Sequence, residues 1–142
     1  MYKNNKGLIE WHLDINSFIP KYIDMCNKFN IDYNNVKFYS QQDEDKYIIQ
    51  YLLKDKITDG VFLEIGACDG ILYNNTKTLE DYFGFTGILI EPQPKFYNQL
   101  IINRPNCKCY NYAVTNKDDE YIEFIGDNAK GGIVNNINTE LN

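Results

Sequence analysis

The sequence predicts an α/β fold with mostly parallel strands, built as a sheet between two layers of helices. Two short apolar runs, residues 61–65 and 87–90, carry this prediction. The first run opens into a loop bracketed by Gly66 and Gly70, and a helical pattern separates the two runs. Strand, glycine loop, helix and strand is the order of a parallel βαβ unit. We therefore expect one three-layer αβα sandwich.

The N-terminal part predicts two helices. In the first, Asn16 or Ser17 caps the helix and Pro20 lies in its first turn. One side of that helix is apolar at near-helical spacing: Phe18, Tyr22, Cys26 and Phe29. After turn-rich residues 30–35, a second helix is predicted over 43–54, with apolar Tyr47, Ile48, Tyr51 and Leu52. We assign residues 1–38 to a helical cover.

The central part predicts a strand, a loop and a helix. Residues 61–65 have the branched and aromatic content of a strand that helices bury on both faces. Residues 74–83 begin with capping side chains, and Leu79, Tyr82 and Phe83 recur on one side. Gly84 ends this helix, since glycine is favoured just past a helix C-terminus.

The remaining elements follow the second apolar run. A helix is predicted from Pro94 to about residue 103, a third strand over 106–112 and a fourth over 121–125. From Gly126 the chain is rich in Asn and Gly, and a loosely held tail is expected over 135–142. Residues 39–134 would then form the core of the fold.

Glu91 is the first candidate site residue. It ends the second apolar run, 21 residues after Gly70. In nucleotide-binding βαβ units, an acidic residue at this position accepts hydrogen bonds from the ribose hydroxyls, and Pro92 and Gln93 would flank the base. Dinucleotide sites need glycine at the first, third and sixth loop positions, whereas this loop has Gly66, Cys68 and Ile71. The spacing therefore argues against NAD.

The acidic residue and glycines of the loop, Glu64, Gly66 and Gly70, resemble the first motif of Rossmann-type S-adenosylmethionine (SAM) methyltransferases. Further segments resemble, in order, the motifs of the FkbM-like methyltransferases: residues 40–48, 62–70, 75–76, 87–92, 112–115 and 121–124. This resemblance covers residues 39–134 and implies a Rossmann-like fold and SAM as cofactor. Cys68 stands where the family usually has Asn, and Glu64 where it usually has Asp. The family's later Asp-x-Glu-Gly segment has no counterpart after Gly132.

The resemblance implies a set of cofactor-binding residues: Gln41, Glu64, Gly66, Ala67, Asp69, Gly70, Asn75, Glu91, Pro92 and Ala113. Other roles stay open for three of them. Glu64 could cap the amides of the following loop, and Asp69 could stabilise a turn as readily as contact the methionine amine. Gln41 precedes a helix, where a capping role is the default.

The implied reaction is methyl transfer from SAM to a hydroxyl of a sugar or other small molecule. Positioning of the two reactants can supply much of the catalysis, and a hydroxyl acceptor also needs a base. Asp69 and Asp127 are the carboxylates to test for that role, and no metal is implied. The alternative is a catalytically silent SAM-binding module, or a fragment, that serves as a partner or scaffold. A nicotinamide-dependent enzyme is a third, weaker reading.

The absent second half of the family pattern leaves Val61–Ile65 as an open apolar edge, and such edges pair readily. We expect the strand over 121–125, the N-terminal helix or a second copy of the chain to cover it, and a homodimer is the favoured answer.

Composition excludes several classes of protein. The net charge is −6 with a pI near 4.7, and no block of Lys or Arg could follow a phosphate backbone, which argues against nucleic acid. No run of about 20 apolar residues predicts a membrane span. We expect a cytoplasmic protein, in the host cytoplasm if the chain is viral. The four cysteines lack C-x-x-C pairs, and buried reduced thiols are expected.

Overall fold

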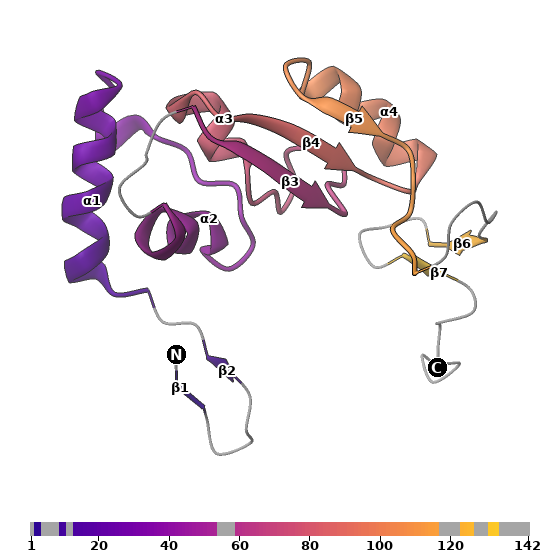
Figure 1. Cartoon of the computed structure of the whole chain (residues 1–142), viewed down its shortest axis with the longest axis horizontal. Helices are drawn as coiled ribbons and strands as arrows, with labels where there is room; N and C mark the ends of the chain where they lie inside the picture. Colours follow the sequence, from indigo (N-terminus) through magenta and orange to yellow (C-terminus); the bar gives the residue numbers. More distant parts are fainter. Residues whose placement is uncertain are drawn as a thin grey trace.

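The main sheet is parallel and has three strands. A computed structural model describes residues 2–3, 9–10, 13–53, 59–116, 123–126 and 131–133. Within these residues, β3 (Val61–Ile65), β4 (Thr86–Ile90) and β5 (Lys108–Tyr110) pair in the order β3-β4-β5 (Figure 1). The α/β class with a parallel sheet is confirmed. The third strand is shorter than the predicted 106–112.

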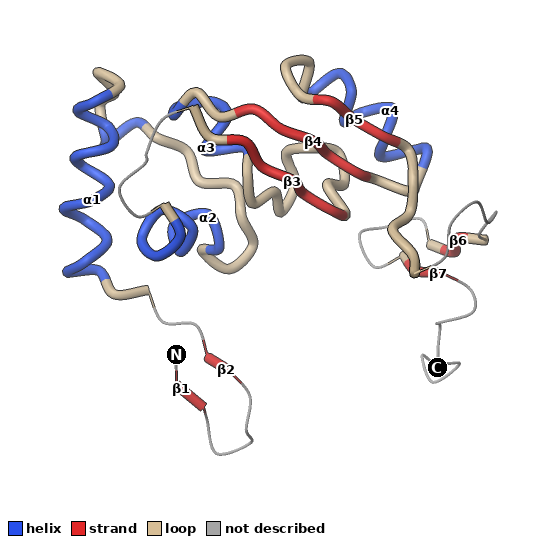
Figure 2. Tube along the Cα trace, viewed as in Figure 1, coloured by secondary structure: helices blue, strands red, loops and turns tan. Residues whose placement is uncertain are grey.

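Two helices connect these strands. Helix α3 (Lys77–Phe83) joins β3 to β4, and α4 (Pro94–Asn103) joins β4 to β5 (Figure 2). Gly84 ends α3 in the left-handed conformation at φ +69°, as predicted. The bounds of α4 match the prediction because Pro94 occupies the first turn, where a missing N–H removes no helical bond.

The two faces of the sheet differ. Phe62 and Leu89 belong to clusters packed with residues of α3 and α4, whereas the side chains of Val61, Leu63 and Ile65 are 79%, 61% and 57% exposed. The prediction that this strand is buried on both faces is therefore wrong. Among the described residues only one face carries helices, because two right-handed crossovers stepping the same way along a sheet place both helices on one side. The described residues therefore form two layers, one of helices and one of strands, and the predicted second helical layer is not among them.

Helix α1 (Ile15–Lys28) begins two or three residues earlier than predicted. Asp14 caps it, since its Oδ1 accepts the amide of Asn16 at 3.1 Å. The predicted caps, Asn16 and Ser17, lie inside the helix, and so does Pro20. The apolar side is confirmed: Phe18, Tyr22 and Cys26 are buried and Phe29 packs against the same cluster.

The second predicted helix splits into two parts. α2 (Glu44–Tyr47) continues into a π-helix, η2 (Ile48–Leu52), in which the Leu53 amide donates to the Ile48 carbonyl at 3.0 Å. Each π-turn holds one more residue than an α-turn, so the buried face shifts. Ile49 and Gln50 are buried, while Tyr51 and Leu52 are exposed, contrary to the predicted apolar face.

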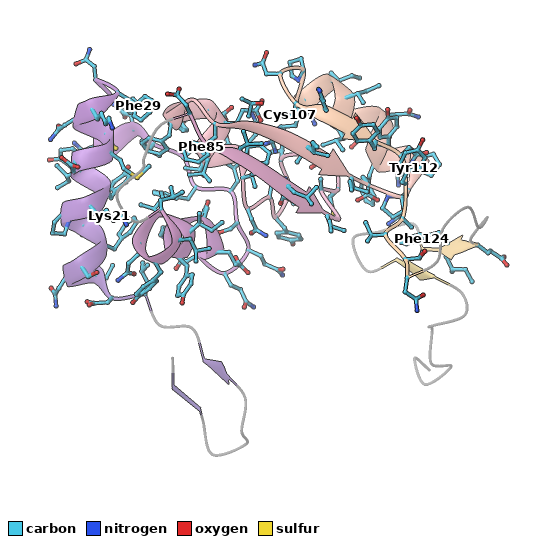
Figure 3. All side chains as sticks on the ribbon, viewed as in Figure 1. Lys21, Phe29, Phe85, Cys107, Tyr112 and Phe124 are labelled. Carbon is cyan, nitrogen blue, oxygen red and sulfur yellow. The ribbon has the colours of Figure 1, made fainter. Side chains whose placement is uncertain are left out.

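The first core cluster joins α1, η2 and α3 near the amino ends of β3 and β4. Its buried members include Met25, Ile49, Phe83 and Phe85. Figure 3 shows Phe29 and Phe85 in this part of the molecule, and Lys21 on α1, whose Nζ donates to the Gln50 carbonyl at 3.3 Å. A 3₁₀ turn, η1 (Tyr33–Asn35), follows α1. Residues 13–38 therefore pack against α3 rather than against the exposed side chains of β3.

Two small antiparallel pairs lie outside the main sheet. β1 (Tyr2–Lys3) pairs with β2 (Ile9–Glu10), and β6 (Phe124–Ile125) pairs with β7 (Gly132–Ile133). The predicted fourth strand therefore pairs elsewhere and does not cover β3. Its first residues, 121–122, and the predicted tail, 135–142, lie outside the described residues. No helix in the described part is long and apolar enough to span a membrane.

Candidate functional site

The carboxyl ends of β3 and β4 lie side by side. Ile65 pairs with Ile90 in the parallel register, so the residues that follow each strand meet at one edge of the sheet. Glu64 and Glu91, at these strand ends, are only 8% and 3% exposed. Two carboxylates thus lie buried where parallel α/β sheets bind their ligands.

The loop from Gly66 to Gly70 turns back over these strand ends. The amides of Gly66 and Ala67 both donate to the Ile90 carbonyl, at 2.8 and 3.1 Å, which fixes the start of the loop against β4. Gly66 and Gly70 have φ of +78° and +83°, and Cys68 between them has +49°. Such angles favour glycine, so the backbone conformation explains both glycines.

The two glycines differ in what surrounds them. A Cβ at Gly70 would lie 2.7 Å from side-chain carbons of Arg104 and Leu100, whereas a Cβ at Gly66 would meet nothing within 4 Å. Gly70 is therefore needed for packing as well as for its dihedral angle. Gly66 faces open space, where a bound molecule could approach the backbone closely.

Glu91 holds the middle of the loop. Its Oε2 accepts the Cys68 amide at 2.9 Å and its Oε1 accepts the Gln93 amide at 2.9 Å. Each carboxylate oxygen has a second lone pair, so these bonds leave acceptor capacity on the carboxylate. Glu91 is thus oriented by the chain and can still accept hydrogen bonds from a ligand.

Glu64 holds the segment that leads into α3. Its Oε1 accepts the Asn75 amide at 2.9 Å and its Oε2 accepts the Thr76 hydroxyl at 2.6 Å. The capping role weighed against cofactor contact is therefore present in this structure. It brings the predicted residues Glu64 and Asn75 into direct contact.

Asp69 stabilises a turn. Its Oδ1 accepts the amides of Ile71 and Leu72 at 2.9 and 2.7 Å, the pattern of an Asx turn. Among the described residues no hydrogen bond engages Oδ2 of this carboxylate. The turn role is therefore observed, and one oxygen remains for another partner.

The pKa of the Cys68 thiol reflects the electrostatic environment of the loop. This pKa is raised to about 11, chiefly by burial and then by the carboxylates of Glu91, Asp69 and Glu64, in that order of importance. Three carboxylates acting on one loop residue create a negative potential. The loop environment therefore favours a cation over an anion.

The end of β5 joins the same edge. Asn111 Nδ2 donates to the carbonyls of Glu91 and Pro92 at 2.8 and 2.9 Å. Ala113 follows two residues later and is half-buried. Pro92 and Ala113 therefore lie on the segments that follow β4 and β5, and Asn111 joins these two segments.

The predicted site residue Gln41 is not brought to the loop. Gln41 is exposed, and no hydrogen bond joins it to the glycine loop within the described residues. Its segment instead docks on α3 through the buried Asp45, which accepts the Tyr39 and Ser40 amides and the Thr78 hydroxyl. Asp127 lies outside the described residues.

The sequence patterns did not single out Arg104, the only arginine of the chain, which is fully buried. Its guanidinium pairs with Glu80 and donates to the Gly70 carbonyl at 3.2 Å and to Asn74 Oδ1 at 2.8 Å. The composition could have pointed to this residue, since it is the one arginine among fourteen basic residues. Arginine rather than lysine is favoured where one buried cation must bind several acceptors.

The described residues contain no group of three His, Cys, Asp or Glu side chains placed to hold a metal ion. All four cysteines are free; Cys26 is buried, and Cys68, Cys107 and Cys109 are half-buried (Figure 3 labels Cys107). The thiols are thus unpaired as expected, but three of them are less buried than expected.

Comparison with protein-family models, curated proteins and solved structures gives no match to this chain. Its function is therefore inferred from the geometry of the loop and its carboxylates, together with the motifs described above.

Proposed function

We propose that the chain binds S-adenosylmethionine at the carboxyl edge of β3 and β4 and belongs to the FkbM-like O-methyltransferases. The observation that carries this proposal is the pair of buried carboxylates, Glu64 and Glu91, that flank a glycine loop with open space at Gly66. In this assignment Glu91 accepts the ribose hydroxyls, and Glu64 and Asp69 face the methionine end.

The charge of the loop supports SAM over a dinucleotide. SAM carries a sulfonium and an ammonium, which suit the negative potential around Cys68. A pyrophosphate needs free backbone amides at the loop and the helix N-terminus. Here Glu91 accepts the Cys68 amide, Asp69 accepts those of Ile71 and Leu72, and Asn74 accepts that of Lys77. These amides are therefore already bonded to side-chain oxygens and are not free to bind a phosphate.

Catalysis in this proposal is in-line displacement. An acceptor oxygen, from a sugar or another small-molecule hydroxyl, attacks the methyl carbon as the carbon–sulfur bond breaks, and the hydroxyl proton goes to a base. The protein contributes mainly by holding the two reactants in line. Asp69 is the candidate base in the described residues, through Oδ2, and Asp127 is the second carboxylate to test.

The first experiment is calorimetric titration of the folded chain with SAM, S-adenosylhomocysteine and NAD. We expect binding of the two adenosyl ligands and none of NAD. Glu91→Gln should weaken S-adenosylhomocysteine binding about 10- to 100-fold, since a neutral amide replaces a charged acceptor of hydroxyl hydrogen bonds. Glu64→Gln should weaken it in the same direction.

Asp24→Asn is the matched control, because Asp24 is an exposed carboxylate on α1 and its loss changes the net charge by the same amount. Circular dichroism should show that all three variants fold. Unchanged affinity in folded Glu64→Gln and Glu91→Gln would contradict the assigned site, and tight NAD binding would contradict the preference for a cation.

A second candidate function is SAM binding without turnover. The engagement of Asp69 Oδ1 in the turn at Ile71 and Leu72 favours it, because these two hydrogen bonds give the carboxylate a structural role in the loop. Incubation with SAM and a panel of sugar and nucleoside acceptors separates the two. Formation of S-adenosylhomocysteine with an acceptor supports the enzyme, and binding without turnover supports the module.

A further inference from the structure

Arg104 connects the parts of the candidate site that the backbone alone leaves separate. It follows α4 directly, and its side chain is fully buried. Its Nε pairs with Glu80 of α3, and its Nη1 donates to the Gly70 carbonyl at 3.2 Å and to Asn74 Oδ1 at 2.8 Å. One guanidinium thus joins α4, α3, the end of the glycine loop and the segment before α3.

A second branch of the guanidinium leads to Glu64. Arg104 Nη2 donates to Thr76 Oγ1 at 3.0 Å, and Thr76 Oγ1 donates to Glu64 Oε2 at 2.6 Å. A guanidinium has donors only, so the hydroxyl oxygen must accept from it and is left to direct its proton elsewhere. Two acceptors lie within reach of the hydroxyl proton, Glu64 Oε2 at 2.6 Å and Asn74 Oδ1 at 3.3 Å, and the nearer, charged carboxylate is the stronger acceptor.

Packing makes this arrangement specific to arginine. The Phe62 ring lies 5.5 Å from the guanidinium carbon, and the stem of Arg104 fills the space where a Cβ at Gly70 would be. A lysine ammonium could still neutralise Glu80, but it lacks the planar fork that reaches Gly70, Asn74 and Thr76 at once.

We propose that Arg104 is a positioning residue of the cofactor site, which orients the Glu64 carboxylate through Thr76 and holds the Gly70 end of the loop. The cofactor part of this inference rests on the proposed function. The orientation of Glu64 does not, since it follows from contacts within the chain. The two parts therefore have separate measurements.

The ligand-free measurement is hydrogen exchange at the Asn75 amide, which donates to Glu64 Oε1 at 2.9 Å. Arg104→Lys and Thr76→Val should speed this exchange at least about tenfold, because each releases the Glu64 carboxylate. Thr76→Ser keeps the hydroxyl and should exchange like the wild type. Exchange at the Leu89 amide, in the centre of the sheet, reports global stability and should change much less.

The ligand measurement is titration with S-adenosylhomocysteine. Arg104→Lys and Thr76→Val should bind it about 10- to 100-fold more weakly, the range seen when a supporting partner of a ligating group is lost, and Thr76→Ser should restore wild-type affinity. If Asn75 exchange stays at the wild-type rate in both variants, or speeds up only together with Leu89, the inference is overturned in favour of a purely structural role. A wild type that binds no adenosyl ligand would overturn the proposed function, while Asn75 exchange would still decide whether Arg104 orients Glu64.

Discussion

The two faces of the parallel sheet are built from similar apolar side chains but have opposite surroundings. On the covered face, Leu89 is completely buried against Leu100 of α4. On the other face, Leu63 of the neighbouring strand is 61% exposed, together with Val61 and Ile65. Apolar composition therefore identifies a strand, but the crossover helices decide which face of it is buried.

The largest expected effect is a difference between two leucines. Leu89→Ala should lower the free energy of unfolding by about 2–5 kcal/mol, because it leaves a cavity in a packed core. Leu63→Ala should change it by no more than about 0.5 kcal/mol, since the side chain is mostly in water. Urea unfolding at micromolar and lower protein concentrations measures both.

The difference in unfolding free energy between Leu89→Ala and Leu63→Ala should persist at the lowest protein concentration, where association contributes least to stability. Equal losses at the two positions there would show that Leu63 is covered within the folded monomer, and would contradict the exposed face.

An intermediate effect is expected on self-association. The outer edge of β3 pairs with no strand among the described residues, and its exposed side chains are apolar. The homodimer stays a prediction, in which β3 of two copies pairs in antiparallel fashion. Leu63→Lys should then weaken association at least about tenfold, because it places a charge at the centre of that interface. Sedimentation velocity measures the change.

Thr86→Lys is the matched control, since Thr86 is exposed at the start of β4, one strand inward from the outer edge of β3. A wild type that stays monomeric at high micromolar concentration would contradict the homodimer.

Local sequence patterns predicted the helix ends that depend on the chemistry of neighbouring residues. The first-turn proline of α4 and the left-handed glycine after α3 marked ends that the structure confirms. The π-turn at Ile48 was not predictable, because apolar periodicity cannot distinguish a shifted register from a regular helix. The one-sided sheet depends on the direction of two crossovers, which composition does not encode.

The candidate site was predictable only in part, for a related reason. The places of Glu64 and Glu91 follow from strand ends, and the structure puts both there. Their hydrogen-bond partners were not foreseen, nor was Arg104, whose acceptors at Glu80, Gly70 and Asn74 lie 24 to 34 residues away in the chain. Contacts at such separation leave no local pattern in the sequence.

The most local effect concerns the single thiol of Cys68 and tests the charge of the loop. Its pKa of about 11 lies above the ordinary value of 9.0, so the thiol stays protonated in the folded chain up to high pH. Its contribution to stability is present below pH 9 and is lost as the pH rises from about 9 to about 11. Because alkylation needs the thiolate, iodoacetamide should modify Cys68 at pH 8 about 100-fold more slowly than an unperturbed thiol.

Glu91→Gln should lower the pH at which Cys68 becomes reactive, since it removes the largest charge contribution after burial. Asp24→Asn should leave that pH unchanged. Peptide mass spectrometry separates Cys68 from the other thiols, and circular dichroism checks that the chain is folded at each pH. A midpoint near 9 in the wild type, or an unchanged midpoint in Glu91→Gln, would mean that the carboxylates do not act on the thiol. The carboxyl edge of β3 and β4 would then lack the negative potential that distinguishes a sulfonium site from a phosphate site.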